Sequence, residues 1–220
     1  MKRIRKPRPG SAQKRIAIVD AAARAIARHG FHGMSMRELA AQTGQVVAGF
    51  YNYFSSKDEL LFHIQRSAFE TMIAGAEDAL RAASSPGDRL FAFIHQHVRY
   101  VAEHPDVMRI LIHEAGALPP PERRKVRALK EKYMALGRGV VAELYQGDDL
   151  ERVTFGIFGM LNWVYGWYDP RRDGTPAEVS RSFHRLALSG LAGDGRGHDR
   201  AEPARRLAVV APLSRFGDKP

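Results

Sequence analysis

Cysteine is absent from this 220-residue chain. Its absence excludes disulfide frameworks, thiol-based catalysis and cysteine-ligated zinc sites. No apolar run reaches the length of a membrane span, and the basic N-terminus lacks the apolar stretch of a signal peptide. We therefore expect a cytoplasmic protein with no membrane partner.

Strand patterns and catalytic motifs are missing as well. No segment alternates apolar and polar residues with a period of two, which predicts an all-α protein. We find no Gly-x-Ser-x-Gly elbow, phosphate-binding glycine loop or paired-carboxylate motif. His95 and His97 would face different sides of a helix, and His113–Glu114 is an isolated dipeptide. We predict no enzyme activity, no cofactor and no metal site.

Positive charge is concentrated near the N-terminus. The formal net charge is +10, and residues 1–60 hold eleven Lys/Arg against four Asp/Glu, a net of +7. Residues 1–10 combine several of these basic residues with two prolines and a glycine, which predicts a flexible basic arm. Such an arm either reaches into a DNA minor groove or only increases solubility.

Helical periodicity and capping signals predict the first four helices. An apolar stripe marks a helix over residues 11–29, which Gly30 ends; the stripe consists of Ile16, Val19, Ala23 and Ile26. Ser35 with Glu38 forms a capping-box signature for a short second helix, and Thr43–Gly44 makes a turn. A third helix is expected over residues 46–53. Ser56 with Glu59 repeats the capping box before a long helix over residues 57–82.

Glycine- and proline-rich breaks separate the later helices, which brings the total to about nine. These helices are expected over residues 88–103, 105–116, 121–145, 150–168 and 176–191. From Gly193 onward glycine, proline and charge dominate, which predicts a disordered tail over residues 193–220.

Two segments resemble one protein family. Residues 30–60 are typical of a helix-turn-helix, whose second helix lies in the major groove of DNA. Its ending, Phe50–Phe54 followed by Ser56–Leu60, resembles the TetR family of bacterial regulators, closely over residues 13–62. The run Gly159–Pro170, together with His104–Pro105, is similar to TetR regulators that respond to acyl-CoA thioesters, including fatty-acid and steroid catabolism repressors.

The resemblance implies an architecture and a function. It implies a three-helix DNA-binding domain over residues 11–56 and a helical bundle for effector binding and dimerisation over residues 57–192. A homodimer would repress transcription by binding double-stranded DNA at an inverted-repeat operator, and an acyl-CoA thioester would release it. A different hydrophobic effector of the efflux or drug type, activation instead of repression, and a non-specific architectural DNA-binding protein remain alternatives.

The family pattern also implies DNA-contacting residues. Tyr51, Tyr53 and Lys57 would contact phosphates, whereas Val47 and Ala48 offer only apolar contact, which favours thymine methyl groups. Burial of Val46 and Val47 against the first helix is the alternative, and Phe50 and Phe54 are expected in the core. The predicted DNA-binding set is Ser35, Arg37, Gln45, Val47, Ala48, Tyr51, Asn52, Tyr53 and Lys57.

Apolar residues and arginines of the second half supply the remaining predictions. The expected effector-binding set is Val101, Arg109, Leu111, Met134, Trp163, Trp167 and Arg171. Arginines that could meet the CoA phosphates are Arg109, Arg123, Arg124, Arg171 and Arg172. The expected helix over residues 150–168 is apolar on most sides, which favours either a dimer interface or burial in the monomer core. The expected dimer set is Phe158, Leu161, Tyr165, Phe183 and Leu186.

Overall fold

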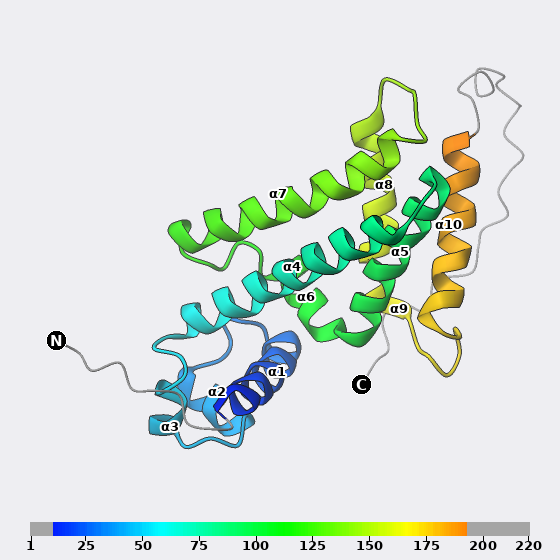
Figure 1. The fold of residues 1–220 in the computed structure, drawn as a ribbon. Coiled ribbons are helices and arrows are strands. Elements are labelled where there is room, and N and C mark those ends of the chain that lie inside the picture. The colour runs from blue at the N-terminus through cyan, green and yellow to red at the C-terminus, as the bar shows by residue number, and fades with distance from the viewer. Residues whose placement is uncertain (1–10, 193–220) are drawn as a thin grey trace, which may run out of the picture. The chain divides into compact units, whose positions relative to one another are not determined.

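The computed structural model describes residues 11–192, and within them all regular structure is helical, as predicted (Figure 1). The predictions for residues 1–10 and 193–220 lie outside the described residues. The helices are α1 (Ser11–His29), α2 (Met36–Gln42), α3 (Val47–Tyr51), α4 (Lys57–Ala82), α5 (Pro86–Glu103), α6 (Pro105–His113), α7 (Pro120–Ala142), α8 (Leu150–Asn162), α9 (Val164–Trp167) and α10 (Pro176–Ala192). None of these helices is long and apolar enough to cross a membrane.

The described residues divide into two compact units. Unit 1 comprises the described residues up to Glu70 together with Asp106–Lys130, and unit 2 comprises Thr71–Pro105 and the described residues from Glu131 onward. This division differs from the expected single boundary between residues 56 and 57. The start of α4, all of α6 beyond Pro105 and the start of α7 group with the helix-turn-helix rather than with the remaining helices.

Helix α1 has the predicted bounds and buries most of the predicted stripe, with one exception. Ile16 was expected on the apolar stripe, yet 62% of it is exposed, so this part of the prediction is wrong. Ala23 and Ile26 are buried as predicted, and Ile18 and Ala22 are buried in addition. The helix ends at Gly30, whose φ of +74° is the left-handed conformation that favours glycine after a helix C-terminus.

The predicted capping box of α2 is confirmed in full. The Ser35 hydroxyl accepts from the Glu38 backbone N–H at 3.3 Å, and the Glu38 carboxylate accepts from the Ser35 backbone N–H at 2.6 Å. The box predicted for α4 is only half right. Ser56 caps the Glu59 backbone N–H at 3.0 Å, but the Glu59 carboxylate accepts from the backbone and hydroxyl of Ser55 instead.

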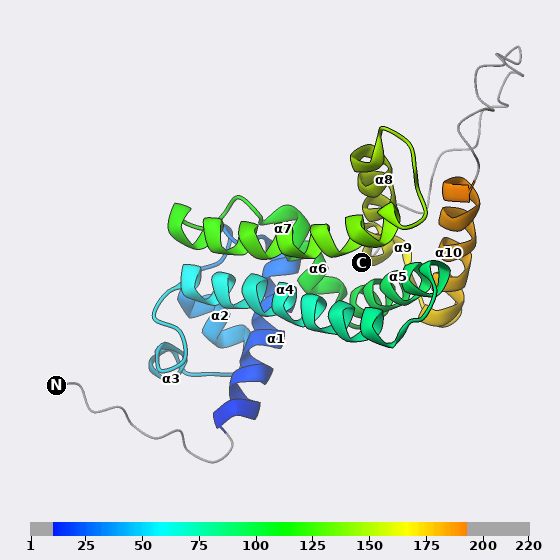
Figure 2. The same cartoon turned by 45° about the horizontal axis from the view of Figure 1, so that its top comes forward.

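Unit 2 is built around α5. This helix buries Ile94, Val98 and Val101 completely. Helices α5 and α10 lie side by side in Figures 1 and 2. His95 Nδ1 lies 3.2 Å from the Ser180 hydroxyl, and His184 Nε2 lies 3.1 Å from the Gly87 carbonyl, so the two helices run antiparallel.

The helix expected over residues 150–168 is broken. It consists of α8 and the single turn α9, with Trp163 between them at φ −75° and ψ −9°. Gly159 and Gly166 flank the break, and glycine has a low helix propensity because its backbone loses the most conformational freedom. The extra segment accounts for ten helices within residues 11–192, where about nine were expected.

Candidate DNA interface and effector region

Helix α3 rests on buried aromatic residues and presents apolar ones to solvent. Phe50 is fully buried and Phe54 is 1% exposed, as predicted for core residues. Val46 is 76% exposed, Val47 36% and Tyr51 50%. The alternative that Val46 and Val47 are buried against α1 is therefore wrong. The exposed face of α3 therefore presents methyl groups that a binding partner can contact.

The start of α3 lacks a side-chain cap. Val46 occupies the N-cap position and has no oxygen to accept from the first backbone N–H groups. The Gln45 side chain does not replace that cap, since its Nε2 donates instead to the Gly44 carbonyl at 3.5 Å. The first N–H groups of α3 are therefore available to an anionic acceptor such as a phosphate oxygen.

Lys57 has a structural role that the sequence did not predict. Its ammonium donates to the backbone carbonyls of Phe31 and Met34, both at 3.1 Å, and lies 4.5 Å from the centre of the Phe31 ring. Two of its three N–H donors are thus committed to the α1–α2 connection, and one remains for a phosphate.

The other predicted DNA-binding residues surround α3 with unequal exposure. Arg37, Ala48 and Asn52 are exposed, Tyr53 is half-buried, and the exposed Ser35 uses its hydroxyl in the α2 cap. Arg15 was missed by sequence reasoning. Its guanidinium lies over the Phe54 ring, 5.3 Å from the ring centre, which places a cation beside the aromatic ending of the helix-turn-helix.

Unit 1 also contains a cavity between α1 and α6. Its volume is about 230 Å³, and its lining is partly charged and partly aliphatic. The lining residues are Ile26, Ala27, Gly30, Arg109, Ile110, His113 and Glu114.

A buried polar network lies in the core of unit 2. The Tyr133 hydroxyl donates to Gln96 Oε1 at 3.3 Å and lies 3.0 Å from His97 Nδ1. Because the hydroxyl proton is used by Gln96, His97 Nδ1 carries its own proton and donates to the hydroxyl oxygen. Burial lowers the pKa of His97 to about 3, and the Asn162 side chain acts in the opposite direction. His97 is therefore neutral near pH 7. No motif or spacing in the sequence indicated this pairing.

Three aromatic rings surround this network. The Phe93 and Tyr133 rings are stacked with centres 5.4 Å apart, and the Phe158 ring meets them edge-on at 5.7 and 5.9 Å. Gly137 makes this possible, because a Cβ there would lie 2.6 Å from the Phe158 ring. The interior of unit 2 thus combines packed aromatic rings with a few oriented polar groups.

The predicted effector residues are divided between the units. Arg109 and Leu111 lie on α6 in unit 1, whereas the remaining five lie in unit 2. Val101 is buried and Met134 is half-buried. Trp163 is 47% exposed, which places it at the surface of unit 2 rather than in its interior.

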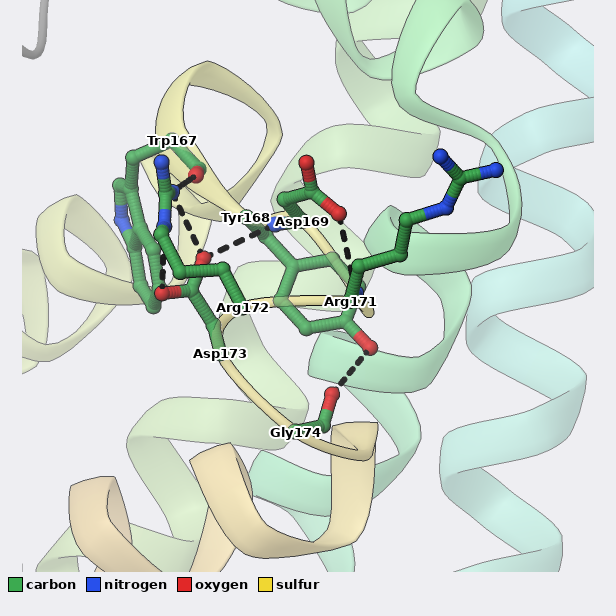
Figure 3. A network of polar contacts seen from close by, with 7 residues as sticks. All are labelled: Trp167, Tyr168, Asp169, Arg171, Arg172, Asp173 and Gly174. Atoms are coloured by element: carbon green, nitrogen blue, oxygen red, sulfur yellow. Dashed lines mark hydrogen bonds and ion pairs between the residues drawn. The ribbon is translucent and has the colours of Figure 1, made fainter.

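The loop after α9 distinguishes two arginines that the sequence could not separate (Figure 3). Arg172 donates to Asp173 at 2.8 Å and to the Trp167 carbonyl at 2.6 Å, so its guanidinium is used within the loop. Arg171 contributes only its backbone N–H, to Asp169 at 2.9 Å. Its guanidinium is exposed and extends away from the network, so it is the one of the two that could bind a phosphate.

Most of the predicted dimer residues are covered by their own chain. Phe158 is 4% exposed, Leu161 is fully buried and Tyr165 is 8% exposed. For these three residues the dimer prediction is contradicted, and burial in the monomer core is correct. Phe183 is half-buried against Trp167, with ring centres 6.2 Å apart, and only Leu186, at 65% exposure, lies open to a partner.

The two short helices, the turn at Thr43–Gly44 and the exposed α3 define a helix-turn-helix DNA-binding protein. Residues 18–64 match the family model of bacterial regulatory proteins of the tetR family, and residues 83–191 match the tetracyclin repressor-like C-terminal domain. The chain belongs to the TetR family of transcriptional regulators, as its aromatic ending predicted.

Individual relatives agree with this assignment. The HTH-type transcriptional regulator BetI of Agrobacterium fabrum is 29% identical over 158 residues, which cover 69% of this chain and 75% of that protein. The fatty acid metabolism regulator protein of Bacillus subtilis is 22% identical over 185 residues, covering 81% and 95%. The crystal structure of AibR in complex with isovaleryl coenzyme A and operator DNA has a TM-score of 0.69 and 25% identity, covering 79% of this chain and 97% of that one.

Proposed function

We propose that this repressor binds an inverted-repeat operator as a homodimer and is released by an acyl-CoA thioester. The observation that carries the effector assignment is the likeness to AibR, whose structure holds both isovaleryl coenzyme A and operator DNA. The likeness to the fatty acid metabolism regulator points to the same chemical class. A different hydrophobic effector of the drug type is the second candidate.

In this proposal α3 enters the major groove and reads it largely through methyl groups. Val47 and Ala48 are exposed, and apolar side chains contact the 5-methyl group of thymine. Tyr51 donates its hydroxyl to a phosphate, while Asn52 and Arg37 supply the polar contacts. Arg15, beside Phe54, adds a phosphate contact that the family pattern did not suggest.

The effector site is proposed in the interior of unit 2. The acyl chain would replace part of the contact among Phe93, Tyr133 and Phe158, and its polar end would meet His97 and Tyr133. The phosphates of CoA require cations at the surface, and the exposed guanidinium of Arg171 is suited to that role.

The dimer surface is proposed on α8 and α10. Phe155 is 55% exposed and Leu186 65%, and such large apolar side chains favour contact with a second copy. A Cβ added at Gly156 or Gly159 would meet nothing within 4 Å, so a partner helix could approach α8 closely there.

Fluorescence anisotropy tests the function directly. The full-length protein is titrated onto its own upstream DNA and then with a panel of acyl-CoA thioesters, with free CoA and the free acids as controls. The proposal predicts sequence-specific binding that one thioester class reverses. Specific binding untouched by the whole panel would reject the acyl-CoA assignment, and binding without sequence preference and with a steep salt dependence would reject the repressor.

Two variants locate the proposed surfaces. Tyr133→Phe should weaken release by the thioester while leaving operator affinity unchanged. Leu186→Glu should shift the protein towards the monomer in light scattering. Ile16→Glu is the matched control for the second variant, because Ile16 is 62% exposed on α1, outside the proposed surface. Equal shifts in both glutamate variants would contradict a dimer surface at Leu186.

A further inference from the structure

His97 has one buried nitrogen without a hydrogen-bond partner. The side chain is 1% exposed, and its Nδ1 lies 3.0 Å from the Tyr133 hydroxyl. Its Nε2 is equally withdrawn from water, and no group within residues 11–192 forms a hydrogen bond with it. The Asn162 side chain is close enough to raise the pKa of His97, but it does not bond to Nε2. A buried polar atom in this state destabilises the fold unless a partner is supplied.

The neighbours of His97 fix the position of its proton. Gln96 Nε2 packs against Gly75 of α4, where an added Cβ would lie only 2.7 Å from it, and Gln96 Oε1 accepts from the Tyr133 hydroxyl at 3.3 Å. The hydroxyl oxygen then accepts from His97 Nδ1–H. Burial keeps the imidazole neutral, with a pKa of about 3, so it holds a single proton. Nε2 therefore carries no proton and is purely a hydrogen-bond acceptor.

Nε2 lies among the rings that enclose the proposed effector site. The Phe158 ring meets the imidazole edge-on, with ring centres 6.0 Å apart. Asn162 is the last residue of α8, and the helix is broken at the next residue. The wall beside Nε2 is therefore formed by a helix end, which can shift more easily than the middle of a continuous helix. A ligand that separates Phe158 from the other rings would reach Nε2.

An acceptor without a proton discriminates among thioesters by their donors. The carbonyl oxygen and the sulfur of a saturated acyl thioester have no hydrogen to donate, so either one would leave Nε2 without a partner. A keto oxygen on the chain would also bring one acceptor against another. A hydroxyl supplies an O–H donor for Nε2, and its oxygen can accept from the amide of the nearby Asn162.

We propose that His97 Nε2 selects a hydroxyacyl thioester, whose hydroxyl at C2 or C3, next to the thioester, donates to this nitrogen. The inference rests on the proposed function and narrows its effector class. Tyr133 and Gln96 are positioning residues, because they hold the proton on Nδ1. One hydrogen bond to a buried acceptor supports a preference of about 10-fold over the saturated thioester.

Operator release measures this preference. The full-length protein on operator DNA is titrated with the acyl-, 2-hydroxyacyl-, 3-hydroxyacyl- and 3-oxoacyl-CoA of one chain length. All four share the amides and phosphates of CoA, so their differences report only on the chain. One hydroxyacyl thioester should release the wild type at a concentration about 10-fold lower than the saturated one, with the 3-oxo thioester weakest. Equal potency of the hydroxylated and saturated thioesters would overturn the inference, and so would strongest release by the 3-oxo thioester.

Three variants assign the preference to Nε2. His97→Phe keeps a ring but removes the acceptor, so the preference for the hydroxyl should disappear. Tyr133→Phe removes the acceptor of Nδ1–H and frees the proton to move to Nε2, so the 3-oxo thioester should gain potency relative to the others. His95→Phe is the matched control, because this half-buried histidine of α5 faces Ser180 outside the network. A wild-type preference in His97→Phe would overturn the inference.

Imidazole ¹⁵N NMR of the wild type tests the nitrogen directly and needs no operator. The His97 signals are those that do not titrate between pH 7.5 and 5.0 and that are missing from His97→Phe. Nε2 should resonate as an unprotonated nitrogen and should shift on addition of the hydroxyacyl thioester, but not of the saturated one. A proton on Nε2 in the free protein would overturn the inference even if the variants do not fold.

Failure of the proposed function gives a different result. Release by all four thioesters at equal concentrations keeps the acyl-CoA assignment and rejects only the selection by His97. Operator binding that no thioester reverses rejects the acyl-CoA assignment and, with it, the hydroxyacyl effector.

Discussion

Helices α3 and α5 depart from the usual distribution of side chains in opposite directions. Helix α3 exposes Val47 and, at its N-cap, Val46, whereas α5 buries Gln96 at 6% exposure and His97 at 1%. An exposed valine is tolerated at little cost, but a buried imidazole or amide destabilises the fold unless it is hydrogen-bonded. The exposed valines of α3 therefore need no hydrogen-bonding partner. The buried Gln96 and His97 of α5, in contrast, depend on hydrogen bonds with Tyr133 from α7.

This contrast indicates that DNA recognition by α3 depends on exposed residues, whereas any ligand recognition by α5 would depend on buried ones. The DNA-facing helix has a single buried residue, Phe50, and its outer residues are free to change without disturbing the core. In α5 the polar residues are part of the core, so at the proposed effector site binding and stability would be coupled. Substitutions on the exposed face of α3 should change DNA binding without changing stability. Substitutions of the buried polar residues of α5 should change both stability and ligand binding.

The largest expected effect comes from the boundary between core and surface in α3. Phe50→Ala removes a fully buried ring and should lower the free energy of unfolding by about 3–5 kcal/mol. Its neighbour Tyr51 is 50% exposed, so Tyr51→Ala should change stability by only about 0.5 kcal/mol. Urea unfolding of both variants measures the difference. An equal loss of unfolding free energy in both variants would contradict the assignment of Phe50 to the core and Tyr51 to the surface.

The pH dependence of unit 2 is the second test. The pKa of His97 is about 3 in the folded protein and about 6.5 when unfolded, so the unfolded state binds more protons between these values. The folded protein is therefore most stable, with respect to His97, above pH 6.5, where the imidazole is neutral in both states. It loses stability as the pH falls below that value, because the unfolded state takes up a proton that the folded state does not. Between pH 7.5 and 5.0 the loss amounts to about 2 kcal/mol.

The variant His97→Gln isolates this contribution. It keeps a hydrogen-bonding side chain near Tyr133 but does not titrate, so its free energy of unfolding should fall less than that of the wild type over the same pH range. Urea unfolding at pH 7.5, where His97 is neutral in both states, is the reference. The same pH dependence in both proteins would contradict a buried, neutral His97.

The third prediction concerns operator affinity. Tyr51→Phe removes only a hydroxyl from an exposed ring, so unfolding should be unchanged while operator binding weakens by about 1 kcal/mol, or roughly fivefold. Anisotropy on operator DNA measures the loss, with non-specific DNA as the comparison. A loss shared by both DNAs fits a phosphate contact, whereas an unchanged affinity would remove Tyr51 from the interface.

The smallest effect has the opposite sign. Val46 occupies the N-cap position of α3 without a side-chain hydrogen bond, and it is 76% exposed. Val46→Ser therefore supplies an oxygen that can accept from the first backbone N–H groups, and it loses little buried apolar surface. The free energy of unfolding should rise by about 0.5–1 kcal/mol. Thermal unfolding checks the gain. A decrease would mean that Val46 stabilises α3 through packing.

Local signals predicted the fold well because they act over a few residues. The Ser35–Glu38 capping box, the bounds of α1 and the start of α6 at Pro105 all depend on neighbours within one helical turn. Periodicity placed Ala23 and Ile26 in the core for the same reason. It failed at Ile16, because a stripe on an isolated helix does not say how far the neighbouring helices extend along it.

Functional residues were predicted less completely. The exposure of Ala48, Tyr51 and Asn52 agrees with their assignment to a DNA-facing helix, which the aromatic pattern of the family made possible. Lys57 was assigned to phosphate by the same pattern, yet it is bound to the carbonyls of Phe31 and Met34. The identity of a charged residue does not reveal which acceptor will be closest to it.

By itself, the sequence determined that this protein is helical, that residues 30–60 form a helix-turn-helix and that the chain belongs to the TetR family. Only the tertiary structure decided that the Glu114 carboxylate accepts from the Phe31 backbone N–H, that His97 is paired with Tyr133 and that Phe158 and Leu161 lie inside their own chain. The physical reason is range. Helix propensity, capping and amphipathic periodicity act within a turn or two, whereas these pairs join residues 36 and 83 positions apart and exist only once packing brings them together.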